Sequence, residues 1–462
     1  MMEKIYKKSI FIFRRDFRLE DNTSLLKALS QSEEVLPIFI LNPNQVESSN
    51  EYRSLNSLHF LFNSLKELDS DLKTLNSRLY IFYGNQIEIL ENLISNLNID
   101  SIFENFDYTP FAKKRSSKIK DLCENKKIEY HTFEDYVLVS PLTFKKADGT
   151  PYGVFTPFYK KASLNDVSLP LENNFNNYFK NDIKSSLDIS YLDSLLDKKN
   201  ENIFVKGGRR EALEILNNLN QYENYSTIRD FPAIRGTTGL SAHLKFGTVS
   251  CREVYLAVQE KLGIEHPLIR QLYWKDFWVQ IAFNFPRVFG KNYLEKFENV
   301  KWDFEKDLFK AWCEGKTGYP IVDAGMRELV STGYMHNRVR MIVASFLTKD
   351  LHIHWKYGEK FFAQHLVDYD PCLNNGNWQW GASTGCDGQP YFRVFNPWRQ
   401  QERFDKDCEY VKKWVSELER FSAEEIKGLE KGFSLKFKDK YYPQIVEHSV
   451  ESKEAIRRFK EC

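Results

Sequence analysis

The residues best suited to chemistry lie in one stretch of the 462-residue chain, positions 315–393. Its charged, amide and indole side chains include Arg340, Asp368, Asp370, Asn374, Asn375, Trp355, Trp378 and Trp380. Charges and amides placed among so many aromatic rings need partners if they are buried, because an unpaired buried charge costs several kcal/mol. By composition alone a tryptophan-rich helical region is more often simply a core. The added polar groups suit a polar, flat, aromatic ligand.

Two other patterns in this stretch suggest chemistry that their spacing does not support. Residues 315–317 read GKT, but a phosphate-binding P-loop needs a glycine five residues earlier, where Lys310 stands. We therefore reject an ATPase. His352 and His354 have no third ligand at a suitable spacing, so we interpret them as packing or surface residues and expect no metal.

Upstream, residues 236–247 read GTTGLSAHLKFG, which sets hydroxyl groups and glycines at the start of a helical run. The free N–H groups and the dipole at a helix N-terminus favour an anion such as phosphate. The same residues would also serve as an ordinary helix cap. The pattern alone leaves both interpretations open.

The composition gives further bounds on function. A net charge of +1, from 65 basic and 64 acidic residues, creates no overall field for nucleic acid, so any DNA contact must come from a local basic patch. The seven cysteines are scattered without a CxxC pair, which favours free thiols in a reducing compartment over a zinc or iron–sulfur site. No stretch reaches about 18 uncharged apolar residues, so we expect a soluble, unexported protein with no membrane partner.

The elements that position these residues differ along the chain. Five short apolar runs predict β-strands at residues 9–13, 35–41, 79–83, 101–106 and 128–132. Helical periodicity lies between them, as in residues 52–75. Alternation of this kind predicts an α/β domain with a doubly wound parallel sheet over residues 1–135. No GxGxxG follows the first strand, so we expect no ordinary dinucleotide site there.

The later parts of the chain read differently. Residues 136–202 are rich in Pro, Ser, Asn and Asp without a period, which predicts a linker that crosses the surface. From residue 203 helical patterns dominate and strand-like alternation nearly disappears. We therefore expect a second, all-α domain over residues 203–462.

Several sequence motifs resemble those of a known protein family. The chain contains RRDFRLEDN at residues 14–22 and then, in order, GKTGYPIVDA, TGYMHNRVRM, DYDPCLNNGNWQW and PYFRVFNP. These motifs resemble the signatures of the DNA photolyase and cryptochrome family over nearly the whole chain. The wording is most like that of class I cyclobutane pyrimidine dimer photolyases. The resemblance implies an α/β N-terminal domain followed by an all-α domain that binds FAD.

The resemblance also implies roles for single residues around the flavin. The cofactor-binding positions are Tyr225, Thr237, Thr238, Gly239, Leu240, Ser241, Lys275, Asn337, Arg340, Asp368, Asp370 and Asn374. Arg340 would pair with Asp368 beneath the flavin, which argues against a paired acid and base at the two aspartates. The amide of Asn374 would face flavin N5 and accept its hydrogen, which suits the reduced flavin and favours repair over plant-type signalling. Electron-transfer roles fall to Trp302, Trp355 and Trp378.

Substrate positions follow from the same resemblance. Taking a damaged base out of the stack costs roughly a few kcal/mol, and each base stacked on an aromatic wall returns ~1–3 kcal/mol. The substrate and DNA positions are Arg229, Gln271, Trp274, Asn337, Arg338, Met341, Trp380, Arg393 and Gln400, with Arg399, Arg403 and Lys406 as a basic rim. Among them, Trp274 and Trp380 would be the aromatic walls and Met341 the floor.

Three departures from the family pattern affect these expectations. Gln271 stands where cyclobutane photolyases usually carry Glu, so it can donate a hydrogen bond to the lesion but no proton. Lys275 replaces an arginine, which keeps the charge and loses the bidentate fork. Ala112 stands where folate-binding members carry a glutamate, so the identity of a second, antenna chromophore stays open between folate, deazaflavin, flavin and none.

We therefore predict light-driven repair of cyclobutane pyrimidine dimers in UV-damaged DNA by electron transfer from reduced FAD. A cryptochrome-type photoreceptor is the alternative, although the chain shows no long low-complexity tail. A (6-4) photolyase is disfavoured, because Asn337 and Met341 stand where those enzymes place catalytic histidines. We expect a monomer that is cytoplasmic and nucleoid-associated, or nuclear if the source is eukaryotic.

Overall fold

The computed structural model describes residues 4–196, 198–433 and 435–462. The chain divides into two compact units, and each unit combines segments that are separated in the sequence. Unit 1 comprises Met1–Lys199, Val205–Gln221 and Gly239–Pro286, whereas unit 2 comprises Asn200–Phe204, Tyr222–Thr238 and Arg287–Cys462. Residues 239–286, from the part of the chain expected to be helical, thus group with the N-terminal sheet. The functional division at residues 135 and 202 stays a prediction.

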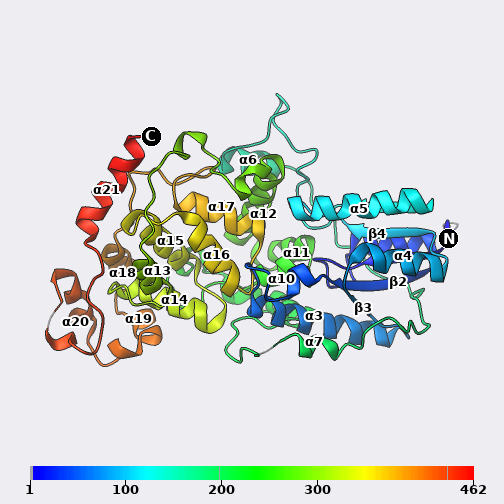
Figure 1. Cartoon of the computed structure of the whole chain (residues 1–462), viewed down its shortest axis with the longest axis horizontal. Helices are drawn as coiled ribbons and strands as arrows, with labels where there is room; N and C mark the ends of the chain where they lie inside the picture. Colours follow the sequence, from blue (N-terminus) through cyan, green and yellow to red (C-terminus); the bar gives the residue numbers. More distant parts are fainter. Residues whose placement is uncertain (1–3, 197, 434) are drawn as a thin grey trace. The chain divides into compact units, whose positions relative to one another are not determined.

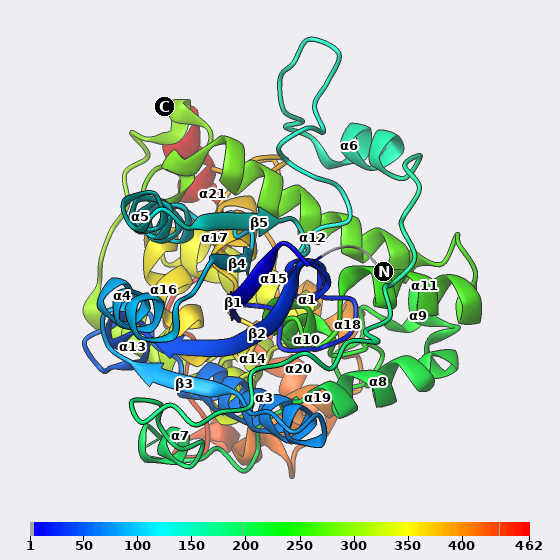
Figure 2. The same ribbon diagram turned by 90° about the vertical axis from the view of Figure 1, so that its right-hand side faces the viewer.

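Unit 1 contains a five-stranded parallel sheet in the order β3-β2-β1-β4-β5 (Figure 2). Its strands are β1 Tyr6–Ile12, β2 Ser32–Leu41, β3 Tyr80–Tyr83, β4 Ser101–Asn105 and β5 Glu129–Phe133. In the central register, Ile10 lies opposite Leu36 on one side and Ile102 on the other. The crossover topology confirms the predicted doubly wound α/β fold.

Helices cover both faces of this sheet, with α4 and α5 on one side and α1 on the other (Figure 2). Their bounds are α1 Thr23–Gln31, α2 Pro43–Val46, α3 Leu55–Thr74, α4 Gln86–Leu97 and α5 Pro110–Lys126. Leu90 of α4 and Ile119 of α5 are fully buried against Ile10 and Ile102 of the sheet. Short polar caps begin the helices, as where Ser54 accepts from Ser57 N at the start of α3.

The segment expected to be a linker is tied to the sheet of unit 1. It contains α6 Phe155–Ala162 and α7 Tyr191–Ser194. Val35 exchanges backbone hydrogen bonds with residues 177 and 179, and Leu187 N donates to Ile81 O at 2.7 Å. These bonds fix the segment along strands β2 and β3. The remaining helices of unit 1 are α8 Arg209–Asn217, α10 Ser241–Phe246, α11 Cys251–Leu262 and α12 Pro267–Asn284.

A buried ion network fixes the loop that follows β1. Arg18 Nη2 donates to Asp135 at 2.6 Å, and Arg252 of α11 bonds both Asp135, at 2.8 Å, and Asp21, at 3.0 Å. Burial alone would raise the pKa of Asp135, but Arg18 and Arg252 outweigh it and lower that pKa to about 2. The RRDFRLEDN motif therefore joins three segments of unit 1.

Unit 2 is helical (Figure 1). Its α-helices are α9 Tyr225–Ile228, α13 Lys306–Cys313, α14 Pro320–Thr332, α15 Asn337–Ser345, α16 Trp355–His365, α17 Pro371–Gly381, α18 Pro397–Phe404, α19 Glu409–Trp414, α20 Ala423–Gly428 and α21 His448–Lys460. A π-helical turn, Phe346–Asp350, follows α15, so the helical winding changes at this point. Buried Trp312, Met326 and Ile342 belong to the core of this unit.

Over residues 4–196, 198–433 and 435–462, no helix is long and apolar enough to cross a membrane. Within the same ranges, no cluster of three or more His, Cys, Asp or Glu side chains is arranged to hold a metal ion.

Candidate functional site

An arginine–aspartate pair stands at the start of α15 in unit 2. His336 caps this helix by accepting from Arg338 N, which places Arg340 in its first turn. The guanidinium of Arg340 donates to Met335 O at 2.7 Å and to Asp368 Oδ2 at 3.1 Å. The Arg340 side chain remains 26% exposed, whereas that of Asp368 is 6% exposed. The pair can therefore still present positive charge to a ligand.

The two aspartates of the DYD motif do different work. Asp370 caps α17, because its Oδ1 accepts from Cys372 N at 2.8 Å and Leu373 N at 3.0 Å. Asp368 instead faces the arginine of α15. This geometry pairs Asp368 with Arg340 and gives Asp370 a capping role, which does not suit a paired acid and base. A contact of Asp370 with the flavin ring stays a prediction.

The amide of Asn374 is oriented by the neighbouring helix α16. Its Nδ2 donates to Glu359 O at 2.9 Å and lies 3.2 Å from Glu359 Oε1. Since the amide nitrogen is engaged there, the side-chain oxygen of Asn374 is left as a hydrogen-bond acceptor. Sequence reasoning missed Glu359. The available signal was its spacing from Trp355 and Phe362, which puts a carboxylate on the buried stripe of α16.

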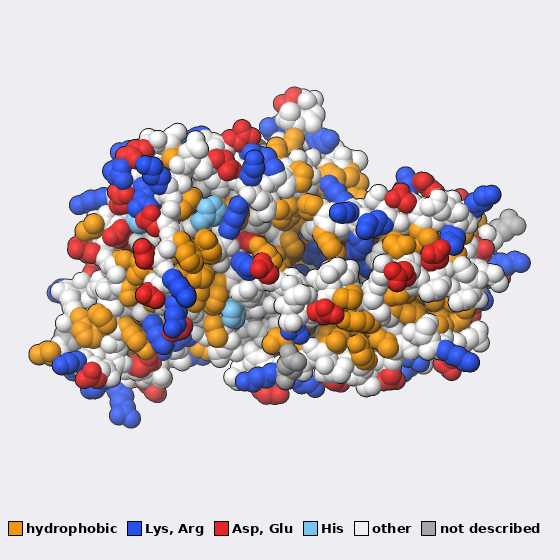
Figure 3. Space-filling view, viewed as in Figure 1, with side chains coloured by type: hydrophobic (Ala, Val, Ile, Leu, Met, Phe, Trp, Pro, Cys, Tyr) orange, Lys and Arg blue, Asp and Glu red, His pale blue; other side chains and the backbone are white. Residues whose placement is uncertain are grey.

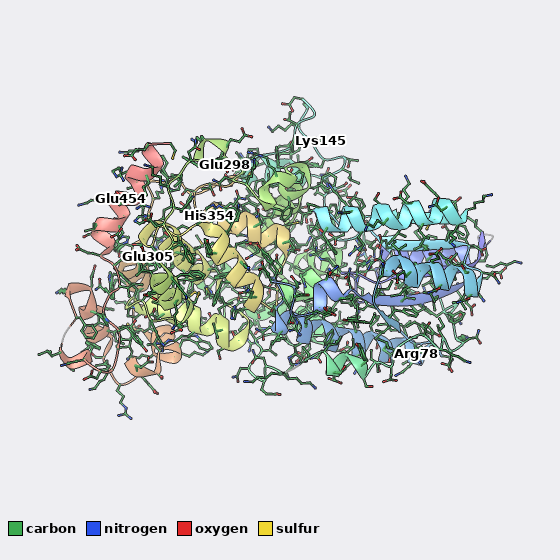
Figure 4. All side chains as sticks on the ribbon, viewed as in Figure 1. Arg78, Lys145, Glu298, Glu305, His354 and Glu454 are labelled. Carbon is green, nitrogen blue, oxygen red and sulfur yellow. The ribbon has the colours of Figure 1, made fainter. Side chains whose placement is uncertain are left out.

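The three tryptophans expected to carry electrons all lie in unit 2. Trp378 is 3% exposed and packs so tightly on Gly358 that a Cβ there would lie 2.1 Å from its ring. Trp355 Nε1 donates to Asn292 Oδ1 at 2.8 Å. Trp302 is partly exposed beside His354, with ring centroids 5.2 Å apart (His354 is labelled in Figure 4).

The two histidines that were rejected as metal ligands, His352 and His354, both bond to other residues of unit 2. His352 Nε2 contacts Glu451 Oε2 at 2.7 Å, which attaches α21 to the π-helical turn region. His354 caps α16 by accepting from Lys356 N at 3.1 Å. Burial lowers the pKa of His354 to about 4, so its ring is neutral at pH 7.

The loop expected to hold phosphate is where the chain passes from unit 2 to unit 1, between Thr238 and Gly239. In unit 2, Thr237 Oγ1 lies 3.2 Å from Tyr334 Oη. The upstream Tyr225 is buried, with the Arg229 guanidinium over its ring at 5.4 Å. In unit 1, Gly239 has φ +72°, a left-handed conformation that favours glycine, and Leu240 leads into Ser241 at the start of α10.

The residues expected to meet the lesion from unit 1 lie on α12. Trp274 stacks face to face on Phe155 of α6, with ring centroids 3.5 Å apart and planes inclined by 7°. One face of this indole is therefore supported by protein. Gln271, one turn earlier, is half-buried, and its Nε2 donates to Pro267 O at 3.3 Å.

The ammonium of Lys275 bonds to other residues of unit 1. It is 6% exposed, and its Nζ donates to Tyr136 O at 2.5 Å and contacts Asp276 Oδ1 at 3.1 Å. Asp276 in turn accepts from Leu138 N and Val139 N. Lys275 thus joins α12 to the chain after β5, and its role towards the flavin phosphates stays a prediction.

Unit 2 supplies the other residues expected at DNA. Arg338 donates to Asp230 at 2.9 Å, and Arg229 lies 3.9 Å from the same carboxylate. Asn337 Nδ2 contacts Met341 Sδ at 3.9 Å. Trp380 on α17 and Gln400 on α18 are partly exposed, and Arg393 is exposed. The structure thus brings together two of these sets, Arg229 with Arg338 and Asn337 with Met341.

A separate, small cleft of about 20 Å³ opens in unit 1 beside the carboxyl ends of β1 and β4. Its lining is Arg14, Arg15, Asn105, Phe106, Asp107, Tyr108, Asp135 and Tyr136. Part of this lining, residues 105–108, comes shortly before Ala112, the position that bears on a second, antenna chromophore. Ala112 is buried in the first turn of α5.

The helical unit fits FAD by the chemistry of its donor set. A partly exposed guanidinium, an amide fixed as an acceptor and an array of indoles meet the needs of an anionic, flat, redox-active ligand. A chain that combines an α/β unit with such a helical unit is of the class of two-unit flavin-binding proteins. The sequence comparisons identify the family within that class.

The chain belongs to the DNA photolyase and cryptochrome family. Residues 9–173 match the DNA photolyase profile and residues 268–461 match the profile described as the FAD binding domain of DNA photolyase. The deoxyribodipyrimidine photo-lyase of Alkalihalophilus pseudofirmus is 35% identical over 97% of each chain. That of Vibrio cholerae is 34% identical over 89% of this chain and 90% of its own.

Solved structures agree with this placement. An archaeal photolyase from Sulfolobus tokodaii, described with two FAD molecules, is 40% identical over 98% of this chain and 100% of its own, with a TM-score of 0.89. A class III photolyase from Agrobacterium tumefaciens is 32% identical over 100% and 98%, with a TM-score of 0.90. These neighbours establish the family and leave the class I assignment as a proposal.

Proposed function

We propose that the protein is a deoxyribodipyrimidine photo-lyase that repairs cyclobutane pyrimidine dimers in DNA under blue light. The observation that carries the proposal is the acceptor orientation of Asn374, which Glu359 fixes in the same unit as the Arg340–Asp368 pair. Its curated relatives at 33–35% identity over most of the chain carry this name.

FAD, when bound in reduced form, supplies the electron that light moves to the lesion and that returns after the ring splits. The chain's residues position this chemistry. Arg340 would offer positive charge to the cofactor, and the side-chain oxygen of Asn374 would accept a hydrogen bond from it. Tyr225 and the loop Thr237 to Ser241 would hold the phosphates. Trp302, Trp355 and Trp378 would only reload oxidised flavin.

Substrate recognition rests on aromatic and amide groups. Trp274 is supported from behind by Phe155, so it offers a stiff wall on which a flipped pyrimidine can stack, together with Trp380. Gln271 would donate to a pyrimidine carbonyl. Because Asn337 and Met341 cannot act as acids, a cyclobutane dimer suits these residues better than a (6-4) product. We assign the protein to class I on the wording of its motifs.

We further propose that unit 1 binds an antenna chromophore on the side of this small cleft. Support comes from its two arginines, Arg14 and Arg15, and from the two FAD molecules of the Sulfolobus tokodaii neighbour. Ala112 removes the carboxylate that folate-binding members use, so a flavin-type chromophore is favoured over folate. Damaged DNA is the proposed partner and a monomer the proposed state.

The test is repair of a thymine cyclobutane dimer in a short single-stranded oligonucleotide by chemically reduced protein, with and without blue light. Light-dependent return of intact thymines is expected. Protein that holds FAD and repairs nothing would favour a cryptochrome-type photoreceptor, and a (6-4) substrate run in parallel would reveal that activity. A dark control with the same protein excludes thermal reversal.

A further inference from the structure

The ring contacts of Trp378 point towards a part of unit 2 that the predicted electron chain does not use. Trp378 lies edge to face with Trp312 of α13, with ring centroids 6.2 Å apart and planes at 71°. Trp312 is completely buried, and its Nε1 donates to Val343 O at 3.2 Å. An oxidisable ring thus stands directly beside Trp378 on the side of α13.

From Trp312 the aromatic contacts continue to the surface. Phe309 stacks on Trp312 at 5.9 Å, and Tyr357 of α16 meets Phe309 at 5.8 Å. Tyr357 also stacks on Phe304 at 4.4 Å. Tyr357 is 42% exposed and Phe304 48% exposed. In Figure 3 hydrophobic side chains gather on the surface over α13 and α16.

The predicted route through Trp355 is electrostatically less favourable for a positive hole. The ammonium of Lys356 lies 5.8 Å from the centre of the Trp355 ring, and its charge opposes a second positive charge there. From Trp355 the ring contacts reach Trp302 through His354, at 5.4 Å and then 5.2 Å. By contrast, the ring neighbours of Trp312 are uncharged.

We propose that Trp312 and Tyr357 form a second route by which electrons enter the protein to reload the flavin. The inference rests on the proposed function, in which Trp378 lies next to FAD. Phe309 and Phe304 are too hard to oxidise to hold the charge themselves, so they serve as packing between and around the two redox-active rings. Tyr357, being exposed, can pass its phenolic proton to water when it is oxidised.

The electrons balance in four steps. Trp378 gives one electron to the light-excited, oxidised cofactor. Trp312 refills Trp378, and Tyr357 refills Trp312 while releasing one proton to solvent. A small thiol then returns one hydrogen atom to Tyr357 and is itself oxidised by one electron. The route ends at a tyrosyl radical, whereas the route through Trp355 ends at a tryptophan.

The test detects that radical directly. After a light flash, FAD-loaded protein without thiol is examined by electron paramagnetic resonance and transient absorption. We expect a tyrosyl signal in Trp355→Phe, its disappearance in Tyr357→Phe, and loss of long-lived radicals in the Trp312→Phe/Trp355→Phe double variant. Growth on ring-deuterated tyrosine should narrow the signal, which assigns it to tyrosine.

Tyr442→Phe is the matched control, because Tyr442 is a half-buried tyrosine of the same unit whose ring contact is with Tyr441. It should leave the signal unchanged. Tyr357 lies at the surface, so its loss of a hydroxyl does not threaten folding, and bound FAD verifies each variant. An unchanged tyrosyl signal in Tyr357→Phe, or none in any variant, overturns the second route.

Failure of this inference is distinguishable from failure of the proposed function. Chemically reduced Trp312→Phe and Tyr357→Phe proteins need no reloading, so both should repair dimers as the parent protein does. Absence of repair in the parent protein would refute the photo-lyase assignment and leave the radical assay valid. Normal repair without a tyrosyl radical would refute the second route alone.

Discussion

Buried polar groups are satisfied differently in the two units. In unit 1, Arg18 is 2% exposed, and both of its terminal nitrogens donate hydrogen bonds, to Asp135, Asp21 O and Gly247 O. In unit 2, Arg340 bonds one carboxylate and one carbonyl and stays 26% exposed. A charge enclosed by protein partners serves folding, whereas a charge left partly accessible can serve a ligand. The exposure and partners of a buried arginine therefore distinguish a structural charge, such as Arg18, from a charge available to a ligand, such as Arg340.

The largest expected effect is in the enclosed network. Replacing Asp135 by Ala leaves Arg18 and Arg252 buried without their shared carboxylate, so we expect a loss of about 3–5 kcal/mol in the free energy of unfolding. Urea unfolding followed by circular dichroism measures it. The folded fraction should keep its flavin. A loss below about 1 kcal/mol would show that the network does not hold unit 1 together.

Acid should destabilise unit 1 through the same carboxylate. The pKa of Asp135 is about 2 in the fold against a usual 3.8, so its contribution is complete above pH 4 and is lost as the pH falls from about 4 to 2. The shift corresponds to about 2 kcal/mol. Stability measured against pH should lose this component in Asp135→Asn. An identical acid profile in that variant would contradict the assignment.

At the partly exposed arginine of unit 2, Arg340→Met should lower the affinity for FAD more than it lowers the free energy of unfolding. Removing a charge-assisted hydrogen-bond donor costs about 1.5–3 kcal/mol of affinity. Arg327→Met is the matched control, because Arg327 likewise bonds a carbonyl and one carboxylate, Gly315 O and Glu417. Titration of apoprotein with FAD measures the difference. Equal affinity in the two variants would remove Arg340 from the cofactor site.

The comparison of the two units also shows which features of the structure could be predicted from the sequence. The strands were predicted to within a few residues, because runs such as 35–41 bury their side chains on both faces of the sheet and so appear as continuous hydrophobic segments. The RRDFRLEDN motif carried the family resemblance, yet no periodicity showed that Arg18 and Asp21 would be enclosed with Asp135. That pairing joins positions more than a hundred residues apart.

Within the site, residue types were predictable and partners were not. The resemblance assigned Arg340 to Asp368, and the structure pairs them. Lys275 was predicted at the cofactor, and no sequence pattern indicated that its ammonium would bond Tyr136 O, an acceptor supplied by a distant loop. Glu359 and Trp312 carried no motif, since their importance comes from packing against Asn374 and Trp378.

A smaller effect is expected at the aromatic wall of unit 1. Trp274→Ala should weaken binding of dimer-containing DNA by about 1–2 kcal/mol, because one stacking face is lost. Flavin content should stay unchanged. Trp278→Phe, one turn further along α12, controls for helix packing. Fluorescence anisotropy with damaged and undamaged oligonucleotides gives both affinities. Undiminished discrimination by Trp274→Ala would place the lesion elsewhere.

The smallest effect on flavin binding should come from Glu359→Gln. This variant tests most directly whether a buried carboxylate of unit 2 serves function or only folding. A glutamine oxygen can still accept from Asn374 Nδ2, and Glu359 O keeps its own 2.9 Å bond, so the amide keeps its orientation. We expect less than about 1 kcal/mol change in flavin affinity. The lost negative charge should raise the flavin reduction potential slightly, as measured by dye equilibration. Glu359→Leu removes the side-chain acceptor and should shift the potential further. If both variants match the parent protein, the carboxylate serves folding alone, as Asp135 does in unit 1.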